Sequence, residues 1–291
     1  MRSSPATWAR PLPCWYARRG RHHLPWRQTR DPWPILVSEL MLQQTPVSRV
    51  LPRYAAFLQR WPEAHSCAAS PLREVLREWQ GLGYPRRAKA LHDCAGHVAA
   101  RGWPMKEVGL RRLPGVGPYT ARALLAFAFE RATVAPREVN LSRVAARAAL
   151  GVEPHEARPA DLDAEISRAR PRGMSWRHYT YALFDVGALH CRSRSPRCEE
   201  CPLDDCLSRR RLREVPPVPS PRRQAPYHGS LRQLRGALLA LSLSSRPPSS
   251  ISELRSHLAT VPAAHRRGAI EKALADLARE GLLPEARVPG H

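Results

Sequence analysis

A glycine-rich turn that leads directly into an apolar segment constrains this chain more than any other feature. Residues 113–121 read LPGVGPYTA, and the apolar residues that follow, 122–129, predict a buried helix. Gly115 and Gly117 lie where the chain must turn sharply, since glycine tolerates backbone angles that other residues avoid. A turn of this kind at the start of a helix points free N–H groups outward and can bind a phosphate. An ordinary loop between two helices would look the same.

The charge of the chain favours a polyanionic partner. Its 291 residues contain 47 Lys and Arg against 25 Asp and Glu, which gives a formal net charge of +22. Such a field attracts nucleic acid, although a GC-rich genome would enrich arginine without any functional meaning. No apolar segment reaches the length of a membrane span, and the N-terminus does not resemble a signal peptide. We therefore expect no membrane partner and a cytoplasmic protein, associated with the nucleoid if DNA is its ligand.

Four of the seven cysteines lie within residues 191–206. Cys191, Cys198, Cys201 and Cys206 are separated by six, two and four residues. Arginine and proline surround them, so no hydrophobic core explains their clustering. A metal ion or an iron–sulfur cluster is the favoured interpretation, and a disulfide pair is the alternative.

The spacing of the apolar residues predicts an all-α protein. Residues 207–226 are rich in Arg and Pro, a composition typical of a linker. After it, the pattern resembles a small winged-helix module. We expect helices over the ranges 35–44, 47–60, 71–80, 85–100, 120–130 and 175–190, and three short helices between 227 and 286.

One carboxylate lies in the middle of the first apolar helix. Glu39 is flanked on both sides by apolar or small residues. If it faces inward, loss of water raises its pKa and keeps it protonated near neutral pH, as a general acid requires. A solvated carboxylate on an amphipathic helix is the alternative. The amides of Gln43 and Gln44 suit contacts with base edges or insertion into a duplex, and ordinary surface residues would look the same.

These motifs occur in the order seen in a known enzyme family. That family is the adenine DNA glycosylases of the MutY type, which belong to the helix-hairpin-helix superfamily that includes endonuclease III. The resemblance covers residues 14–206, and its most specific part is 38–45. The short C-terminal region is similar to that of some actinobacterial members and not to the larger oxoguanine-reading domain of many others. The segments that carry the resemblance are LPWR (24–27), SELMLQQT (38–45), GLGY (81–84), LPGVGPYTA (113–121) and the cysteine cluster.

The resemblance implies a two-lobed helix-hairpin-helix glycosylase fold. It also implies a [4Fe–4S] cluster on the four cysteines, which we favour over zinc. The last cysteine spacing is four residues where the family usually has five, so the loop must be tighter here. The expected parts are an N-terminal arm packing on the cluster lobe (1–30), a six-helix lobe with the helix-hairpin-helix (31–136), a cluster lobe with the cysteine loop (137–206), a linker (207–226) and a winged-helix-like module (227–291).

The resemblance further implies an active site and a DNA-contacting surface. Glu39 matches the general acid that protonates N7 of a flipped adenine, and Asn140 matches an active-site asparagine. Tyr119 matches a position where bifunctional relatives have a Schiff-base lysine, so strand cleavage is not expected. Gln44 and Tyr84 match residues that enter the helix stack. The residues expected to contact DNA are Arg27, Gln43, Gln44, Tyr84, Gly115 and Gly117.

One catalytic position departs from the family pattern. Two residues before its asparagine, the family has an aspartate that stabilises the positively charged sugar of the transition state. This chain has Glu138 there, after a one-residue insertion upstream. Glutamate keeps the charge but is one methylene longer, and a misplacement of about 1 Å can cost on the order of a hundredfold in rate. We expect Glu138 to be ionised because Arg137 and Arg143 are near in sequence.

The implied function is hydrolysis of the N-glycosidic bond of adenine mispaired with oxoguanine or guanine in double-stranded DNA, by a monofunctional and monomeric enzyme. Two alternatives stay open. One is a non-catalytic DNA-binding paralogue that has lost its chemistry through the change at Glu138. The other is a glycosylase with a different base preference.

Overall fold

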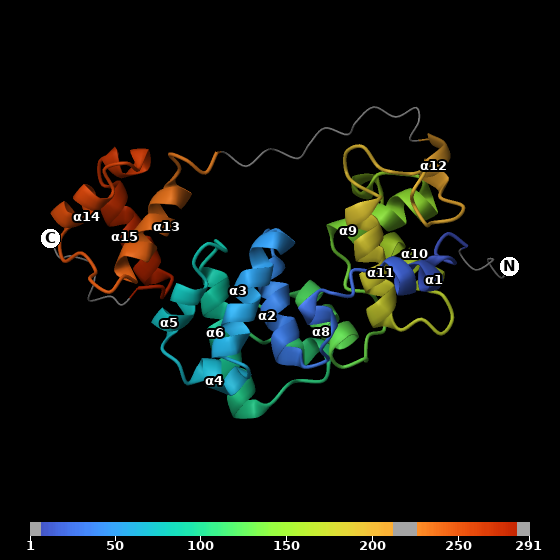
Figure 1. Cartoon of the computed structure of the whole chain (residues 1–291), viewed down its shortest axis with the longest axis horizontal. Helices are drawn as coiled ribbons and strands as arrows, with labels where there is room; N and C mark the ends of the chain where they lie inside the picture. Colours follow the sequence, from blue (N-terminus) through green and yellow to red (C-terminus); the bar gives the residue numbers. More distant parts are fainter. Residues whose placement is uncertain (1–6, 212–225, 284–291) are drawn as a thin grey trace. The chain divides into compact units, whose positions relative to one another are not determined.

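The computed structural model of the protein describes residues 7–211 and 226–283, and in these ranges it contains only helices and connecting loops (Figure 1). The lack of any strand among these residues confirms the predicted all-α class. No helix in the described ranges is long and apolar enough to cross a membrane. The chain divides into two compact units: the first contains residues 1–39, 104–112 and 116–220, and the second contains 40–103, 113–115 and 221–291.

Helix α11 (Trp176–Leu189) is the centre of the first unit. Ser175 caps its N-terminus, where the Ser175 hydroxyl accepts a hydrogen bond from the His178 N–H at 3.2 Å. The helix contacts α1, α8 and α9. Gly187 permits the approach of α9, because a Cβ there would lie 2.7 Å from the Cβ of Asn140. The other helices of this unit are α1 (Leu12–Arg19), η1 (Pro25–Arg27), most of α2 (Pro32–Leu42), α7 (Glu107–Leu110), α8 (Pro118–Phe127), α9 (Val139–Ala145), η2 (Ala146–Leu150), η3 (Pro154–Glu156), α10 (Pro159–Ala169) and α12 (Leu207–Arg211).

Aromatic side chains form much of the core of the second unit. Phe57, Trp61 and Trp79 are buried, and the ring centroid of Phe57 lies 4.7 Å from that of Trp61 and 6.3 Å from that of Trp79. Such pairs contribute about 0.5–1.5 kcal/mol beyond the burial of their surface. Around this core, α6 contacts α4 and α5. The helices of this unit are α3 (Val47–Arg60), α4 (Ala64–Ala68), α5 (Leu72–Glu78), α6 (Arg86–Arg101), α13 (Leu231–Ser242), α14 (Ile251–His257), η4 (Pro262–His265) and α15 (Ala269–Arg279).

Two expectations change in the C-terminal part of the chain. Residues 207–211 were assigned to the linker but form helix α12, and residues 212–225 of that linker lie outside the described residues. The module after residue 227 contains the three expected helices, but its described residues contain no strand. The winged-helix assignment is therefore not confirmed, and the domain boundaries stay a prediction.

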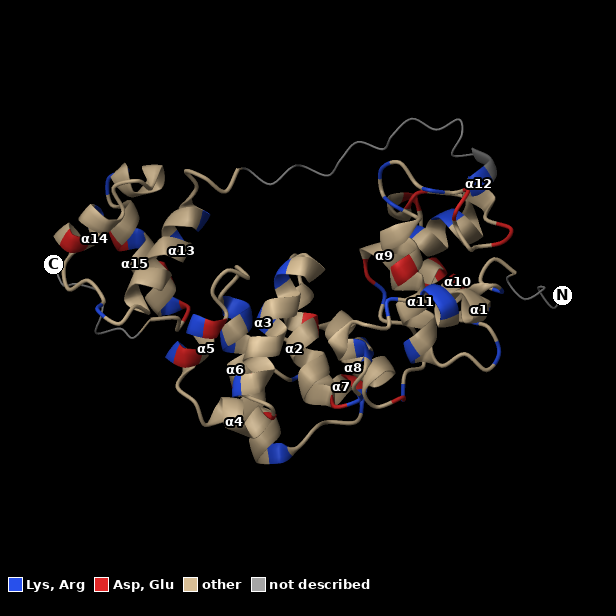
Figure 2. Cartoon of the chain, in the orientation of Figure 1, with Lys and Arg blue, Asp and Glu red and all other residues tan. Residues whose placement is uncertain are grey.

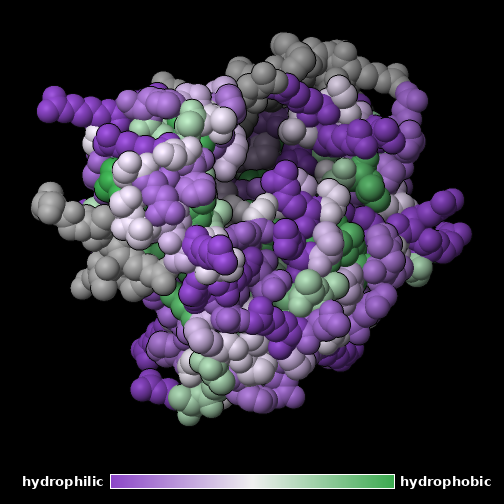
Figure 3. Space-filling model, turned by 60° about the vertical axis from the view of Figure 1, so that its left-hand side comes forward, coloured by the Kyte–Doolittle hydropathy of each residue, from purple (hydrophilic) through white to green (hydrophobic). Residues whose placement is uncertain are grey.

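The distribution of charge fits a polyanionic ligand. Lys and Arg occur on helices of both units (Figure 2). The face drawn in Figure 3 is mostly hydrophilic, and hydrophobic residues appear there as small separate spots. Dispersed positive charge attracts nucleic acid.

Asp185 anchors the N-terminal arm to α11. Its carboxylate accepts hydrogen bonds from Nη1 and Nη2 of Arg27 at 2.7 and 2.9 Å, and from Nε and the backbone N–H of Arg21 at 2.5 and 2.9 Å. The Asp185 side chain is fully buried. Burial acts to raise the pKa of Asp185, but the hydrogen bonds and positive charges of the two arginines outweigh it, and the pKa is lowered. The arm therefore depends on an ionised carboxylate in the core.

We expect Asp185→Asn to destabilise the protein strongly. The substitution leaves the buried Arg27 guanidinium without its counter-charge, which typically costs about 3–5 kcal/mol. Urea unfolding at pH 7 measures the loss. Asp161→Asn is the matched control, because Asp161 pairs with Arg158 on the surface and such pairs contribute little. Equal effects of the two substitutions would contradict the anchoring role.

Candidate active site

Glu39 is a buried carboxyl group on α2, with only 6 % of the residue exposed. Burial raises its pKa from 4.5 to about 7; a hydrogen bond with Tyr119 opposes the shift, the negative charge of Glu138 adds to it, and the positive charge of Arg27 opposes it. The predicted rise in pKa is confirmed. At neutral pH a large fraction of Glu39 therefore carries the proton that a general acid donates.

Tyr119 lies in the first turn of α8, directly after Pro118. Burial and the negative charge of Glu39 both raise the pKa of Tyr119 well above 10. The phenol therefore stays protonated and remains a hydrogen-bond donor at neutral pH. A side-chain hydrogen bond joins Tyr119 to Glu39, so the two residues act as one unit.

Glu138 is the N-cap of α9. Its Oε1 accepts from the backbone N–H groups of Asn140 and Leu141 at 2.7 and 3.0 Å, and its Oε2 accepts from Asn140 Nδ2 at 3.2 Å. Burial nevertheless raises the pKa of Glu138, because the hydrogen bonds and the positive charge of Arg143 only partly offset it. Of the two arginines expected to favour its ionised form, Arg143 does lower the pKa of Glu138, but this effect does not outweigh burial. Arg137 binds Asp163 instead, through Nε and Oδ1 at 2.5 Å.

Arg143 connects this helix start to the cysteine segment. Its Nη2 donates to Asn140 Oδ1 at 2.6 Å and to the Gly187 carbonyl at 2.9 Å, and its Nε donates to the Cys191 carbonyl at 2.6 Å. Asn140 in turn bonds Glu138. A continuous series of hydrogen bonds therefore joins the Glu138 carboxylate to Cys191.

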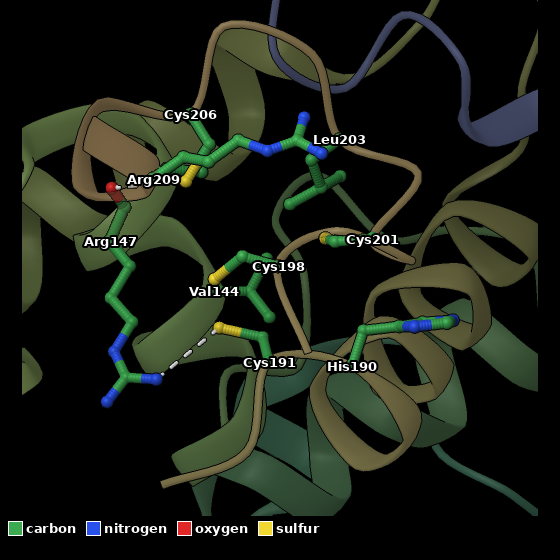
Figure 4. Close-up of a pocket in the computed structure, with 10 residues that line it drawn as sticks. Val144, Arg147, His190, Cys191, Cys198, Cys201, Leu203, Cys206 and Arg209 are labelled. Atoms are coloured by element: carbon green, nitrogen blue, oxygen red, sulfur yellow. Dashed lines mark hydrogen bonds between the residues drawn. The ribbon is translucent and has the colours of Figure 1, made fainter. Parts of the chain in front are cut away.

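The four clustered cysteines line one pocket (Figure 4). All four are free, so the disulfide alternative is not observed. The nearby Arg147 is buried and donates from Nη1 to Cys191 Sγ at 3.8 Å and to the Arg192 carbonyl at 2.7 Å. The other residues that line the pocket are Val144, Ala148, His190, Leu203 and Arg209.

The four thiols surround one cavity. In the described part of the chain, no three His, Cys, Asp or Glu side chains are gathered so that they could hold one metal ion. Arg147, which donates to a sulfur atom, adds positive charge beside thiolate ligands. The donor set therefore fits an iron–sulfur cluster.

Gln44 and Tyr84 lie together in the second unit. Both are exposed, and the Tyr84 hydroxyl donates to Gln44 Oε1 at 2.6 Å. Both also have positive φ angles, 56° and 49°, which are uncommon for residues other than glycine. Gln43 is only half-exposed. The structure thus joins the two residues that the sequence resemblance led us to expect in the helix stack.

The two hairpin glycines differ in what they require. Gly115 has a φ of 75°, and a Cβ there would lie 2.9 Å from the Cβ of Ala90, so its backbone and its surroundings both demand glycine. Gly117 is the N-cap of α8 and has an extended backbone with open space around it. Both glycines are exposed. Only Gly115 is therefore irreplaceable on conformational grounds.

Arg27 does not match its expected role. Its side chain is 4 % exposed, its Nη atoms bind Asp185, and its guanidinium lies 4.5 Å from the centre of the Tyr181 ring. It is therefore not available to a phosphate, contrary to the expectation of DNA contact. Sequence motifs did not single out Asp185. They predicted a charge effect of Arg143 on Glu138 but not its hydrogen bonds to Asn140 and to the Cys191 carbonyl.

Comparisons with known proteins agree with this geometry. Residues 37–168 match the family model of the HhH-GPD superfamily base excision DNA repair protein. Adenine DNA glycosylase of Mycolicibacterium smegmatis is 43 % identical over 244 residues, which cover 82 % of each chain. That of Mycobacterium tuberculosis is 42 % identical over 272 residues, or 91 % of this chain and 88 % of the relative. Thymine-DNA glycosylase of Aeropyrum pernix is 36 % identical over 200 residues, or 66 % and 88 %.

Solved structures show the same fold. A thermostable thymine-DNA glycosylase matches with a TM-score of 0.61 and 27 % identity, covering 69 % of this chain and 94 % of that one. An endonuclease III–DNA complex matches with a TM-score of 0.59 and 20 % identity, covering 71 % and 95 %. The fold and the site define a base-excision DNA repair protein of the HhH-GPD superfamily. Within it, the chain belongs to the adenine DNA glycosylases.

We expect Glu39→Gln to stabilise the protein increasingly as the pH rises. A carboxyl with a pKa of about 7 in the folded state and 4.5 when unfolded binds its proton more tightly in the native state, so the wild type loses stability as the pH rises from 4.5 to about 7. Glutamine does not titrate. The gain in unfolding free energy should therefore grow by on the order of 3 kcal/mol between pH 4.5 and pH 8.

Urea unfolding at both pH values tests this expectation. Glu63→Gln is the control, because the Glu63 side chain is 65 % exposed. A difference between the Glu39→Gln variant and the wild type that is the same at both pH values would contradict the raised pKa.

Proposed function

We propose that this protein hydrolyses the N-glycosidic bond of adenine mispaired with oxoguanine or guanine in double-stranded DNA. The single observation that carries the proposal is the buried Glu39 carboxyl, with a pKa of about 7, hydrogen-bonded to Tyr119 and close enough to Glu138 for their charges to interact. Family membership at 42–43 % identity to adenine DNA glycosylases supports the choice of base.

In the proposed reaction, protonated Glu39 donates its proton to N7 of an adenine that has left the stack. The bond between the sugar C1′ and the base N9 then breaks, and its electron pair leaves with the base. Water adds to the resulting oxocarbenium-like sugar and loses a proton. The Tyr119 hydroxyl, bonded to Glu39, holds the carboxyl in place, and because it is not an amine it forms no Schiff base. The enzyme is therefore monofunctional.

Glu138 supplies the negative charge that stabilises the sugar in this proposal. Its carboxylate position is set by the start of α9, where three N–H groups bind its two oxygen atoms. A carboxylate that accepts several N–H donors is favoured in its ionised form, although burial opposes this. Glu138 is one methylene longer than the family aspartate, so its carboxylate is the group of the site that is most easily misplaced.

We infer that Cys191, Cys198, Cys201 and Cys206 hold a [4Fe–4S] cluster. Such a cluster supplies one-electron redox chemistry when bound. The residues of this chain then fix the loop: Arg147 donates to Cys191 Sγ, and Arg143 donates to the Cys191 carbonyl and to Asn140. The loop thereby supports the start of α9, and with it the Glu138 carboxylate.

The DNA-contacting residues of the proposal lie on exposed turns. Gln44 and Tyr84 would enter the duplex next to the mispair, and the turn at Gly115 and Gly117 would bind a phosphate. The net charge of +22 supplies the general attraction. The proposed partner is double-stranded DNA containing a mispaired adenine, bound by a monomer associated with the nucleoid.

A second candidate function is removal of a different base. Thymine-DNA glycosylase of Aeropyrum pernix is 36 % identical over most of its length, so the scaffold accepts more than one base preference. The alternative of a non-catalytic DNA-binding protein rests on the replacement of the family aspartate by Glu138, and an assay of adenine release tests it.

We expect Glu39→Gln to abolish adenine release and to leave duplex binding nearly intact, because glutamine cannot donate a proton and general acids contribute about 10²- to 10⁴-fold. The wild-type rate should fall as the pH rises through about 7, where Glu39 ionises.

Glu138→Asp should accelerate release if the longer side chain misplaces its charge. Single-turnover release of labelled adenine from a duplex with an adenine–oxoguanine mispair measures the rates, and equilibrium binding to the same duplex measures the affinity of the Glu39→Gln variant.

Glu63→Gln, on the surface, is the control for both substitutions. Full activity of Glu39→Gln would refute the catalytic assignment. An inactive wild type rescued by Glu138→Asp would identify a paralogue that has lost its chemistry, and release of another base would identify the second candidate function.

The cluster proposal predicts a coloured protein. Purified without oxygen, it should be brown and contain about four irons per chain. Cys198→Ser should lower the iron content, whereas Cys14→Ser should not, since Cys14 is exposed and lies outside the pocket. Iron analysis and absorbance spectroscopy measure both. A colourless protein with stoichiometric zinc would contradict the proposal.

A further inference from the structure

Two neighbouring turns of the second unit carry the exposed residues Gln44 and Tyr84. One turn follows the last helical residue of α2, and the other precedes α6. The turns are joined by the bond between Tyr84 and Gln44 and by the buried Thr45, whose hydroxyl donates to the Leu82 carbonyl at 3.2 Å. Each turn holds a residue with positive φ. Such conformations persist only when the surrounding structure enforces them.

Arg87 of α6 bonds to both turns at once. Toward the end of α2, its Nη1 donates to the carbonyl oxygens of Leu40 at 2.7 Å and Gln43 at 2.5 Å. Toward the second turn, its Nη2 donates to the carbonyl oxygens of Leu82 at 3.0 Å and Gly83 at 3.1 Å. One planar group thus fixes two separate pieces of backbone.

The aromatic residues of the second turn complete the environment of Arg87. Its guanidinium carbon lies 5.7 Å from the centre of the Trp79 ring and 5.1 Å from that of the Tyr84 ring. The Trp79 indole donates to the Gly83 carbonyl at 3.1 Å. Among the described residues, no carboxylate pairs with Arg87. The acceptors it uses are backbone carbonyls and the Thr45 hydroxyl.

The chemistry of these contacts demands arginine. Burial lowers the pKa of Arg87 to about 10, so the group is still charged at neutral pH. Its acceptors at the end of α2 carry the negative end of the helix dipole, which favours a cation. The guanidinium presents several N–H groups in a fixed plane, whereas a lysine ammonium is a single point with three donors. A lysine would keep the charge and lose most of the bonds.

We propose that Arg87 is a positioning residue that holds Gln44 and Tyr84 together as one preformed element for entering the helix stack at a mispair. The proposal rests on the proposed DNA-binding function. Because the turns are fixed before DNA arrives, little order has to be gained on binding, and preorganisation of this kind increases affinity for the specific ligand. Arg87 acts through the two turns and not through a phosphate.

The test compares Arg87→Lys with Arg86→Lys. Arg86 is the adjacent residue, its side chain is 71 % exposed, and it pairs with Glu280, so the same substitution there is a matched control. Binding is measured to a duplex with 2′-fluoroadenosine opposite oxoguanine, since the fluorine slows loss of the base, and to the fully paired duplex, each at several salt concentrations. Thermal unfolding confirms that both variants fold.

We expect Arg87→Lys to lower the preference for the mispaired duplex by about tenfold, or ~1.4 kcal/mol, with an unchanged dependence on salt. Arg86→Lys should keep the preference. An unchanged preference in Arg87→Lys would overturn the proposal. An equal loss of affinity for both duplexes would overturn it too, because it would identify a DNA contact that does not depend on the mispair.

A measurement without DNA separates this proposal from the proposed function. The Thr45 and Leu82 amides are bonded within the two turns, to the Leu42 and Trp79 carbonyls. Their hydrogen exchange in the free protein should accelerate on the order of tenfold in Arg87→Lys but not in Arg86→Lys. Unchanged exchange would overturn the positioning role. A wild type without mispair preference would instead refute the proposed function, whatever the exchange shows.

Discussion

The burial of one carboxyl group in an apolar helix is the constraint on which the rest of the site depends. Glu39 is 6 % exposed, and a carboxyl without water is stable only if it keeps its proton or finds donors. Tyr119 supplies one hydrogen bond, and the negative charge of Glu138 discourages ionisation. Burial raises the pKa of this acid, and the positions of α8, which carries Tyr119, and of α9, whose N-cap is Glu138, adjust it in opposite directions.

The two carboxyl groups show how environment separates chemically similar residues. Burial raises the pKa of both carboxyl groups. Three N–H donors at the start of α9 bind the oxygen atoms of Glu138. The hydrogen-bond partner of Glu39 is instead the protonated phenol of Tyr119. Backbone N–H groups favour an ionised carboxylate. One group is therefore suited to give a proton and the other to hold a charge, although both are glutamates.

Local sequence predicted the helices, because apolar periodicity depends on neighbours along the chain. It predicted the raised pKa of Glu39 only if that residue faces inward, and the fold decides this by burying it. It did not predict the partners of charged groups. Arg137 was expected to influence Glu138 but binds Asp163, and Arg27 was expected on the surface but binds Asp185 at a sequence separation of 158. Pairs of this kind form through folding and have no periodicity. A sequence shows that a cation is present, and only the fold shows which acceptor it meets.

Bonds of arginines within the protein also limit how much of the net charge can contact DNA. A value of +22 counts every arginine as a candidate for DNA contact, but several of them are half-buried or buried and donate to backbone carbonyls inside the protein. Those side chains fix loops and helix ends, and their bonds would have to break before they could reach a phosphate. The charge available to DNA is therefore smaller than the sequence indicates, and the surplus of arginine over lysine partly serves the fold, because the guanidinium reaches several carbonyls at once. The arginines that bond carbonyls in this way include Arg73, Arg77, Arg87, Arg143, Arg147 and Arg177.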